Sequence, residues 1–144
     1  MGDTYLGSAF ANISKHSVEK ELFNRMNKTI PNLKLTSGLR SFGYGSCTGW
    51  VYTHLNQALQ NYSKAGFDDA IASLECANGG TPVADAFIEI ETDLADAKGN
   101  IAIIMLSDGY QYADSPASAV LALKQQYGDK LCLHTVCGWV MRKK

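Results

Sequence analysis

The strongest hydrophobic pattern in the chain is an uninterrupted run of six apolar residues at positions 101–106. This pattern is typical of a strand that is buried on both faces, and such strands belong to parallel sheets covered by helices. The run is too short to cross a membrane, which takes about 20 apolar residues. It ends at Ser107-Asp108-Gly109. Because ligands of open α/β sheets bind outside the carboxyl ends of the strands, Asp108 is a candidate site residue, with an ordinary Asp-Gly turn as the alternative.

Apolar residues at helical spacing predict four helices, over about 14–30, 67–76, 82–97 and 115–127. Ser14 or Ser17 can cap the first helix, and Pro31 ends it. The third helix is expected to have Thr81 as its cap and Pro82 at its first helical position. The expected inward-facing residues are Val18, Leu22, Phe23, Met26 and Ile30; Phe67, Ile71 and Leu74; Val83, Phe87, Ile90 and Leu94; and Val120, Leu121, Leu123 and Tyr127.

Three further segments are predicted to be strands. Residues 33–43 alternate between apolar and polar and are expected to bend near Gly38. Residues 50–59 are β-prone at their start and suit an antiparallel edge strand, on which His54 is an exposed residue. Residues 131–140 form the last strand, whereas residues 1–14 hold none. Strands that alternate with helices predict a three-layer α/β fold with a mostly parallel sheet in a single domain, 1–144.

Composition narrows the possible functions. The chain has 144 residues, of which 46% are hydrophobic and 19% are charged, as in an ordinary globular domain. Thirteen basic and fourteen acidic residues leave a net charge of −1. This balance argues against a nucleic-acid binder or a binder of anionic membranes, because both need a basic surface. No signal peptide and no membrane-inserting segment is expected.

Four cysteines are present without a CxxC pair, and zinc is not expected from their spacing. Cys132 and Cys137 are five residues apart in a predicted strand, so they point to opposite faces and cannot bridge each other. Cys47 and Cys76 lie in predicted loops. They form a disulfide in an oxidising compartment or remain free thiols in a reducing one, and both alternatives stay open.

Two loops are expected at the same edge of the sheet: Gly79-Gly80-Thr81-Pro82 before a helix, and Ser107-Asp108-Gly109 after the central strand. The Thr81 hydroxyl and the Asp108 carboxylate are hard oxygen ligands that suit Mg²⁺, Mn²⁺ or Ca²⁺. A phosphate loop is excluded because GxxxxGK[ST] and its lysine are missing. Alternatively, Thr81 only caps its helix.

These segments resemble the von Willebrand factor A (VWA) domain family. The resemblance rests on the sequence from Gly79 to Ala86, on residues 103–109, on Leu39-Arg40-Ser41-Phe42-Gly43, and on the order of elements between positions 15 and 140. It is closest to bacterial cell-envelope members, which are often joined to an OmpA-like domain. The resemblance implies a Rossmann-like α/β/α fold, a location in the cell envelope or periplasm, and a metal-ion-dependent adhesion site. Because no signal peptide is expected, the cytoplasm is the alternative location. At that site Thr81 and Asp108 would be ligands, supported by Gly79, Gly80, Ser107 and Gly109.

The family's first ligand loop reads Asp-x-Ser-x-Ser, and this chain has no such motif. Met1-Gly2-Asp3 is similar to the residues that follow it in relatives, so we expect the chain to start just after the motif, without the first central strand and three ligands. Two oxygens would hold a cation weakly. The missing strand would also leave two strand edges unpaired. The expected outcomes are direct pairing of 33–43 with 101–107, a strand borrowed from another chain, self-association or poor solubility.

The resemblance implies a non-enzymatic module that binds a protein carboxylate through a divalent cation. The second hypothesis is a metal-independent interaction or structural domain, including a truncated gene product. The third is a small α/β hydrolase or phosphotransferase that uses Asp108, but the chain lacks a nucleophile elbow and a phosphate loop.

Overall fold

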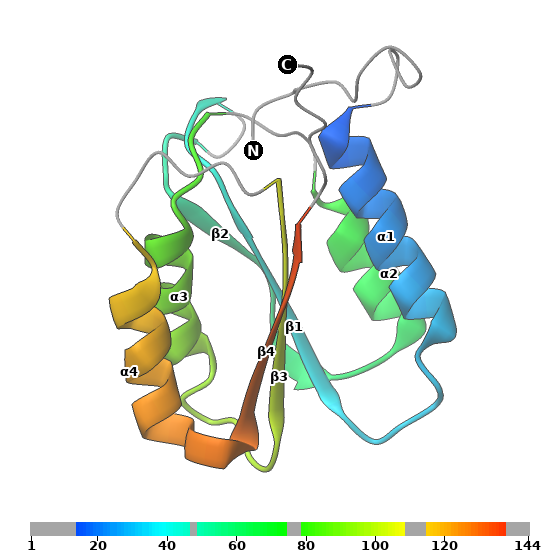
Figure 1. The fold of residues 1–144 in the computed structure, drawn as a ribbon. Coiled ribbons are helices and arrows are strands. Elements are labelled where there is room, and N and C mark those ends of the chain that lie inside the picture. Colours follow the sequence, from blue (N-terminus) through cyan, green and yellow to red (C-terminus); the bar gives the residue numbers. More distant parts are fainter. Residues whose placement is uncertain (1–13, 47–48, 75–78, 109–114, 138–144) are drawn as a thin grey trace.

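The computed structural model describes residues 14–46, 49–74, 79–108 and 115–137, and it shows a mixed α/β fold (Figure 1). Within these ranges helices and strands follow one another as the sequence pattern predicts. The elements are α1 (Lys15–Thr29), β1 (Thr36–Phe42), β2 (Thr53–Asn61), α2 (Lys64–Ala72), α3 (Val83–Asp93), β3 (Ile101–Ser107), α4 (Ala117–Tyr127), a 3-10 turn (Gly128–Lys130) and β4 (Leu131–Cys137). In the described part of the chain, no helix has the length and apolar character needed to cross a membrane.

The strands form two separate sheets instead of the single, mostly parallel sheet that was predicted. β1 pairs antiparallel with β2, and β3 pairs parallel with β4 in continuous register from Ile101↔Leu131 to Ser107↔Cys137. Within the described residues, β1 and β3 do not pair with each other. Direct pairing of these two strands, one of the expected outcomes, is therefore not what the structure shows.

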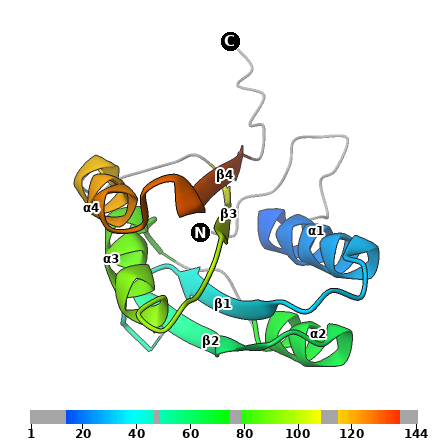
Figure 2. The ribbon, with the colours of Figure 1, turned by 90° about the horizontal axis from the view of Figure 1, so that it is seen from below.

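The helices lie in two pairs at the sides of the strands. α1 and α2 are adjacent on one side, and α3 and α4 are adjacent on the other (Figures 1 and 2). Seen from below, β3 and β4 lie on one side of the space between the helix pairs, and β1 and β2 lie on the other (Figure 2). The space between β1 and β3 is flanked by α1 and α3.

Two apolar clusters form the core. The larger cluster joins α3, α4, β3 and β4, and the smaller one joins β1 to α2. The larger contains Val83, Phe87, Ile101, Ala119, Leu123 and Leu131, and the smaller contains Leu39, Ala70 and Ile71. Of the predicted inward positions on α4, Leu123 is buried, whereas Leu121 is 60% exposed and that prediction is wrong. Val120, the residue before Leu121, contacts the cluster. Because successive residues of an α-helix are rotated by about 100°, Leu121 points away from the cluster.

The first helix begins as predicted but does not bury its apolar face. The Ser14 side chain accepts a hydrogen bond from the Ser17 amide and caps α1. The fully buried residue of α1 is Asn27, whereas Leu22, which was expected inside, is 38% exposed. Phe23 and Met26 line the space between the two sheets, and Phe23 also packs against the smaller apolar cluster.

The ends of the other elements differ from the prediction in ways that local hydrogen bonds explain. β1 has register shifts around Leu39, beside the bend expected at Gly38. α2 begins earlier than predicted because the Ser63 side chain caps it by accepting from the Gly66 amide. Pro82, not Thr81, occupies the cap position of α3, without a side-chain capping bond, and α3 ends at Asp93. The prediction of Thr81 as a cap is therefore wrong.

The antiparallel strand and the last strand are confirmed with shorter ranges. β2 begins at Thr53 and not at residue 50, since residues 49–50 form a turn before the strand. His54 on β2 is exposed, as expected. β4 is described up to Cys137, so the predicted residues 138–140 lie outside the described part of the chain, as does the predicted polar lead over residues 1–13.

Candidate functional site

The carboxyl end of β3, the loop before α3 and the start of α1 all lie at the same end of the molecule (Figure 1). Asp108 follows β3, and its Oδ2 atom is 3.2 Å from the Nζ atom of Lys15 on α1. The side chains of Asp108 and Lys15 are 7% and 13% exposed. The Asp108 carboxylate, which follows the end of β3, therefore forms a largely buried ion pair. Asp108 lies at the end of the molecule where the sequence pattern predicted it, but the ion pair was not predicted.

The loop before α3 approaches the segment after β1 closely. Gly79 forms a parallel bridge with Tyr44 and has a φ of 73°. A side-chain Cβ at Gly79 would collide with the Tyr44 carbonyl, so this position requires glycine. Thr81 follows in the same loop and is buried, with 5% of its surface exposed. The Gly79–Tyr44 bridge thus connects the candidate loop to a surface that the sequence analysis did not include.

That surface is an aromatic cluster, which we define as Tyr44, Trp50 and Tyr52. The rings of Tyr44 and Trp50 are 5.6 Å apart in an edge-on arrangement, and those of Tyr44 and Tyr52 are 4.9 Å apart. These residues are 39%, 65% and 53% exposed, and Val51 beside them is also exposed. Exposed aromatic side chains that stabilise one another are unusual on a surface without a function, and they are frequent in protein interfaces.

The backbone holds the cluster in a defined turn. Trp50 has a φ of 63°, which is costly for a bulky side chain. The Trp50 amide donates to the Gly45 carbonyl at 2.9 Å, and the Gly43 amide donates to the Tyr52 carbonyl at 2.9 Å. These hydrogen bonds hold the backbone on both sides of the strained residue, and the Trp50 side chain is largely exposed there.

Glu19 lies one helical turn from Lys15 and lines the cleft between the sheets. Burial raises the pKa of the Glu19 carboxyl to about 7. The negative charge of Asp108 contributes to the increase, and the positive charge of Lys15 opposes it. Two carboxyl groups and one ammonium group are therefore electrostatically coupled at this end of α1.

Thr81 and Asp108 are the described residues that the resemblance assigns as metal ligands. The described part of the chain contains no cluster of three or more His, Cys, Asp or Glu residues that could hold a metal ion. The Lys15 ammonium already neutralises Asp108, and it would repel a divalent cation placed beside that carboxylate. These donors do not fit a tightly held cation while Lys15 remains in place. Ser107, the supporting residue before Asp108, is 4% exposed.

Several predicted residues cannot be placed. Gly109, Cys47 and Cys76 lie outside the described residues. The supporting role of Gly109 in the loop after β3, and the choice between a Cys47–Cys76 disulfide and free thiols, therefore stay predictions. Cys132 on β4 is an exposed, free thiol. Gly80 is in the loop before α3, and a Cβ there would have open space around it. Its glycine is therefore not required by the described neighbours.

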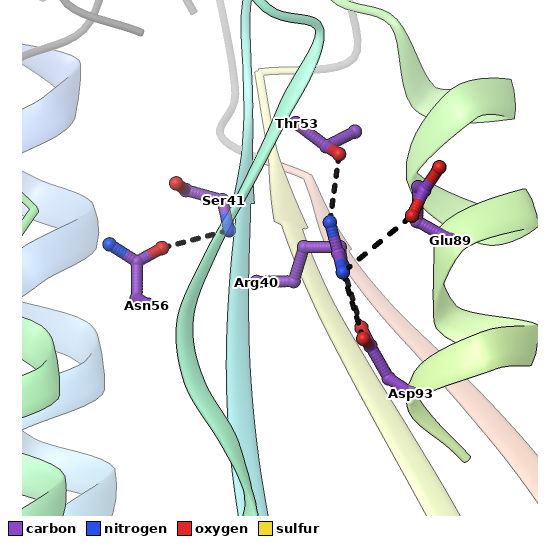
Figure 3. Close-up of polar contacts among 6 residues, drawn as sticks. All are labelled: Arg40, Ser41, Thr53, Asn56, Glu89 and Asp93. Carbon is purple, nitrogen blue, oxygen red and sulfur yellow. Dashed lines mark hydrogen bonds and ion pairs between the residues drawn. The ribbon is translucent and has the colours of Figure 1, made fainter. Parts of the chain in front are cut away.

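A second polar group connects β1 and β2 to α3 (Figure 3). Arg40 on β1 forms a two-pronged ion pair with Asp93, with N–O distances of 2.6 and 2.8 Å, and donates to the Thr53 hydroxyl at 2.8 Å. Glu89 adds a longer ionic contact at 3.8 Å. Hydrogen bonding to Asp93 raises the pKa of Arg40 above its ordinary value. This group positions α3, and hence the loop that precedes it, against the antiparallel sheet.

Lys15, Glu19 and Arg40 were not predicted to be site residues. Lys15 and Glu19 are one turn apart on α1, and a polar pair at that spacing is equally typical of a solvated helix face. Arg40 was a polar residue in an alternating strand. The aromatic cluster had a detectable signal, because Trp50 and Tyr52 closely follow three glycines in seven residues at positions 43–49.

The chain was compared with protein-family models, with curated proteins and with solved structures, and none of them matches. The resemblance to the von Willebrand factor A family, and the site residues carried over with it, therefore stay predictions.

Proposed function

We propose that the chain is a non-enzymatic protein-binding module of the von Willebrand factor A type, with an incomplete three-layer fold. The proposal assigns the contact surface to the aromatic cluster and the neighbouring loop that contains Gly79 and Thr81. The observation that carries it is the exposed group of Tyr44, Trp50 and Tyr52, which the Gly79 bridge attaches to that loop. A location in the cell envelope is part of the proposal through the resemblance alone.

Tyr and Trp bury a large area for few rotatable bonds, and such residues dominate the affinity of many protein interfaces. Here the rings already contact one another and the backbone is held by hydrogen bonds, so a partner would lose little conformational entropy by ordering them. This preorganisation supports a binding role for the surface.

Two modes of recognition differ in their need for a metal ion. In the cation-dependent mode, Thr81 and Asp108 would help to hold the ion and the partner would supply a carboxylate. The Lys15–Asp108 pair favours the cation-independent mode in this chain, because the ammonium group competes with the ion for the same carboxylate. We therefore propose that the wild-type chain binds its partner without a cation. Lys15 prevents a cation at Asp108 from strengthening this binding.

The experiment is to select peptides from a displayed random library on the wild-type chain and to measure their affinity by fluorescence anisotropy. Trp50→Ala should weaken the selected peptides by about tenfold or more, as expected for an interface hot spot. Leu121→Ala is the matched control, since Leu121 is 60% exposed, close to the 65% of Trp50, but lies on α4. Equal losses in the two variants, or a failure to select any peptide, would contradict the proposal.

The same peptides separate the two modes. Wild-type affinity should be equal in Mg²⁺ and in EDTA, and Lys15→Met should make binding stronger in Mg²⁺ because the competing charge is removed. Lys28→Met, at an exposed position on the same helix, is the control for charge alone. If wild-type binding disappears in EDTA, the cation-dependent mode replaces the cation-independent one.

A further inference from the structure

The space between the two sheets is a cleft with the properties of a strand-binding site. Its volume is about 980 Å³, and its walls come mainly from β1, β2, β3, α1 and α3. Within the described residues, β1 pairs only with β2 and β3 only with β4, so the edges of β1 and of β3 from Ile101 to Leu106 that face this cleft have no strand partner there. An unpaired strand edge presents a row of backbone donors and acceptors that an additional strand can satisfy.

The two edges are matched in length and direction. β1 and β3 each contain seven residues. Both run from the end of the molecule that holds the loop after α1 toward the end that holds Asp108 (Figure 1). An extended segment of seven residues spans about 23 Å and could lie parallel to both strands.

The side walls specify the side chains that such a segment would carry. Phe23 and Met26 of α1, with Ile30 just after it, line one side. Phe87 and Ile90 of α3, with Leu94 just after it, line the other. Because both faces of an inserted strand would meet apolar side chains, the strand must be apolar on both faces, as β3 itself is. Polar alternation, which suits a half-exposed strand, would not fit.

A buried polar atom in the cleft independently indicates a missing donor. Gln57 is 8% exposed and lines the cleft, and its amide nitrogen donates to the carbonyl and to the hydroxyl of Ser37. Its Oε1 atom is buried and has no hydrogen-bond partner among the described residues. A buried acceptor without a donor is costly, and an occupant of the cleft that brought a donor to Gln57 would remove that cost.

From these observations we infer that the cleft between β1 and β3 binds an extended, apolar peptide segment of another protein by adding it as a strand that joins the two sheets. A second copy of this chain is the less favoured occupant. Each strand in the described part already belongs to a sheet, so a second copy would have to break one of its own pairs. The inference concerns a surface separate from the aromatic cluster and goes beyond the proposed function.

The test uses a fluorescent synthetic peptide that carries the β3 sequence, Ile-Ala-Ile-Ile-Met-Leu-Ser, with two lysines at each end for solubility. The peptide should bind the wild-type chain saturably in fluorescence anisotropy. The same peptide with proline as its fourth residue should bind at least about tenfold more weakly, because proline removes a backbone donor and cannot continue a ladder. Equal binding of both peptides would overturn the inference.

Two matched variants locate the binding. Ile104 lines the cleft and is 42% exposed, and Ile88 on α3 is 56% exposed and does not line it. Ile104→Lys should weaken the peptide by about tenfold or more, because it places a charge in the cleft, and Ile88→Lys should change the affinity by less than about twofold. Trp50→Ala should leave the peptide affinity unchanged, which separates this site from the proposed function.

Hydrogen exchange of the wild-type chain provides a measurement that does not depend on the folding of any variant. Bound peptide should slow the exchange of amides in both β1 and β3. Slowing in only one of them, or in neither, would overturn the inference. So would a wild-type dimer in sedimentation that dissociates on Ile104→Lys and ignores the peptide, because a second copy would then occupy the cleft.

Discussion

The two halves of the molecule are stabilised by different kinds of contact. The half made of α3, α4, β3 and β4 buries the larger apolar cluster, in which two helices cover a continuous parallel pair of strands. The half made of α1, α2, β1 and β2 buries a smaller apolar cluster between β1 and α2, and polar residues are buried beside it. An element that faces the open cleft therefore depends on hydrogen bonds for a unique position.

Asn27 is the centre of those hydrogen bonds. Its amide nitrogen donates to the Lys64 carbonyl at 2.9 Å and to the Asp68 carboxylate at 2.7 Å, and its Oδ1 accepts from the Tyr62 hydroxyl at 2.7 Å. The residue is 1% exposed. A buried and fully satisfied polar network sets one geometry between elements, and here it places α1 against α2.

The largest effect that sharpens this comparison is expected in the two cores. Leu123 and Ile71 are both 1% exposed, one in each apolar cluster. Leu123→Ala should lower the free energy of unfolding by about 3–5 kcal/mol, because helices and strands surround the side chain and cannot collapse into the cavity. Ile71→Ala should cost about 2–3 kcal/mol, since the small cluster near the cleft can relax.

Urea denaturation followed by circular dichroism measures both values. Ile71→Val serves as a graded control and should cost about 0.5–1.5 kcal/mol. If Ile71→Ala destabilises the chain as much as Leu123→Ala, the two cores are equally rigid and the contrast between the halves fails.

The ion pair between Arg40 and Asp93 connects the two halves and should have an intermediate effect. The Arg40 and Asp93 side chains are 11% and 18% exposed. Arg40→Met should lower the free energy of unfolding by about 1–3 kcal/mol, because it removes charged hydrogen bonds and leaves the Asp93 carboxylate without them. Arg40→Lys should cost less, since it keeps the charge but loses the two-pronged geometry.

A double-mutant cycle with Asp93→Asn isolates the pair itself. The coupling between the two positions should exceed about 0.5 kcal/mol, the range seen for residues in direct contact. Additive effects would show that Arg40 acts through packing alone and that the two halves are not connected through this contact.

The sequence pattern predicted the half with the larger core better than the half with the polar network. The six apolar residues before Ser107 correctly predicted a parallel strand, but the prediction that both of its faces are buried is wrong, because Ile104 is 42% exposed and lines the open cleft. The burial of Phe87 and Leu123 follows from helical spacing. The pattern on α1 suggested a buried apolar face, but burial depends on what lies opposite the helix. Asn27 breaks the apolar spacing, so its burial could not be read from the periodicity.

The place of the candidate site in the fold was predicted, but most of the residues that surround Asp108 and Thr81 there were not. The strand end placed Asp108 at the expected end of the molecule, yet its ion-pair partner Lys15 comes from a helix 93 residues away in the sequence. No local pattern specifies which charged residue of a solvated helix face meets a distant strand end. The aromatic cluster likewise depends on the bridge between Gly79 and Tyr44, which is a tertiary contact.

The smallest expected effect concerns the pH dependence of α1 packing through Glu19. Its carboxyl has a pKa of about 7 in the folded chain and 4.5 ordinarily, so the folded state binds this proton more tightly than the unfolded state does. Its contribution to stability is therefore present below about pH 4.5 and is lost as the pH rises through 7. Glu19→Gln should be more stable than the wild type at pH 8, because the buried charge is removed, and the difference should vanish near pH 4.

Thermal unfolding of both chains between pH 4 and pH 8 measures this difference directly. Glu21→Gln is the matched control on the same helix, because hydrogen bonding to Arg25 lowers the pKa of that exposed carboxyl. Its removal should give no gain at pH 8. A pH-independent difference for Glu19→Gln would mean that the carboxyl is as well solvated in the folded chain as in the unfolded one. The cleft beside α1 would then be wetter than its apolar walls indicate, and the contrast between the two halves would rest on packing alone.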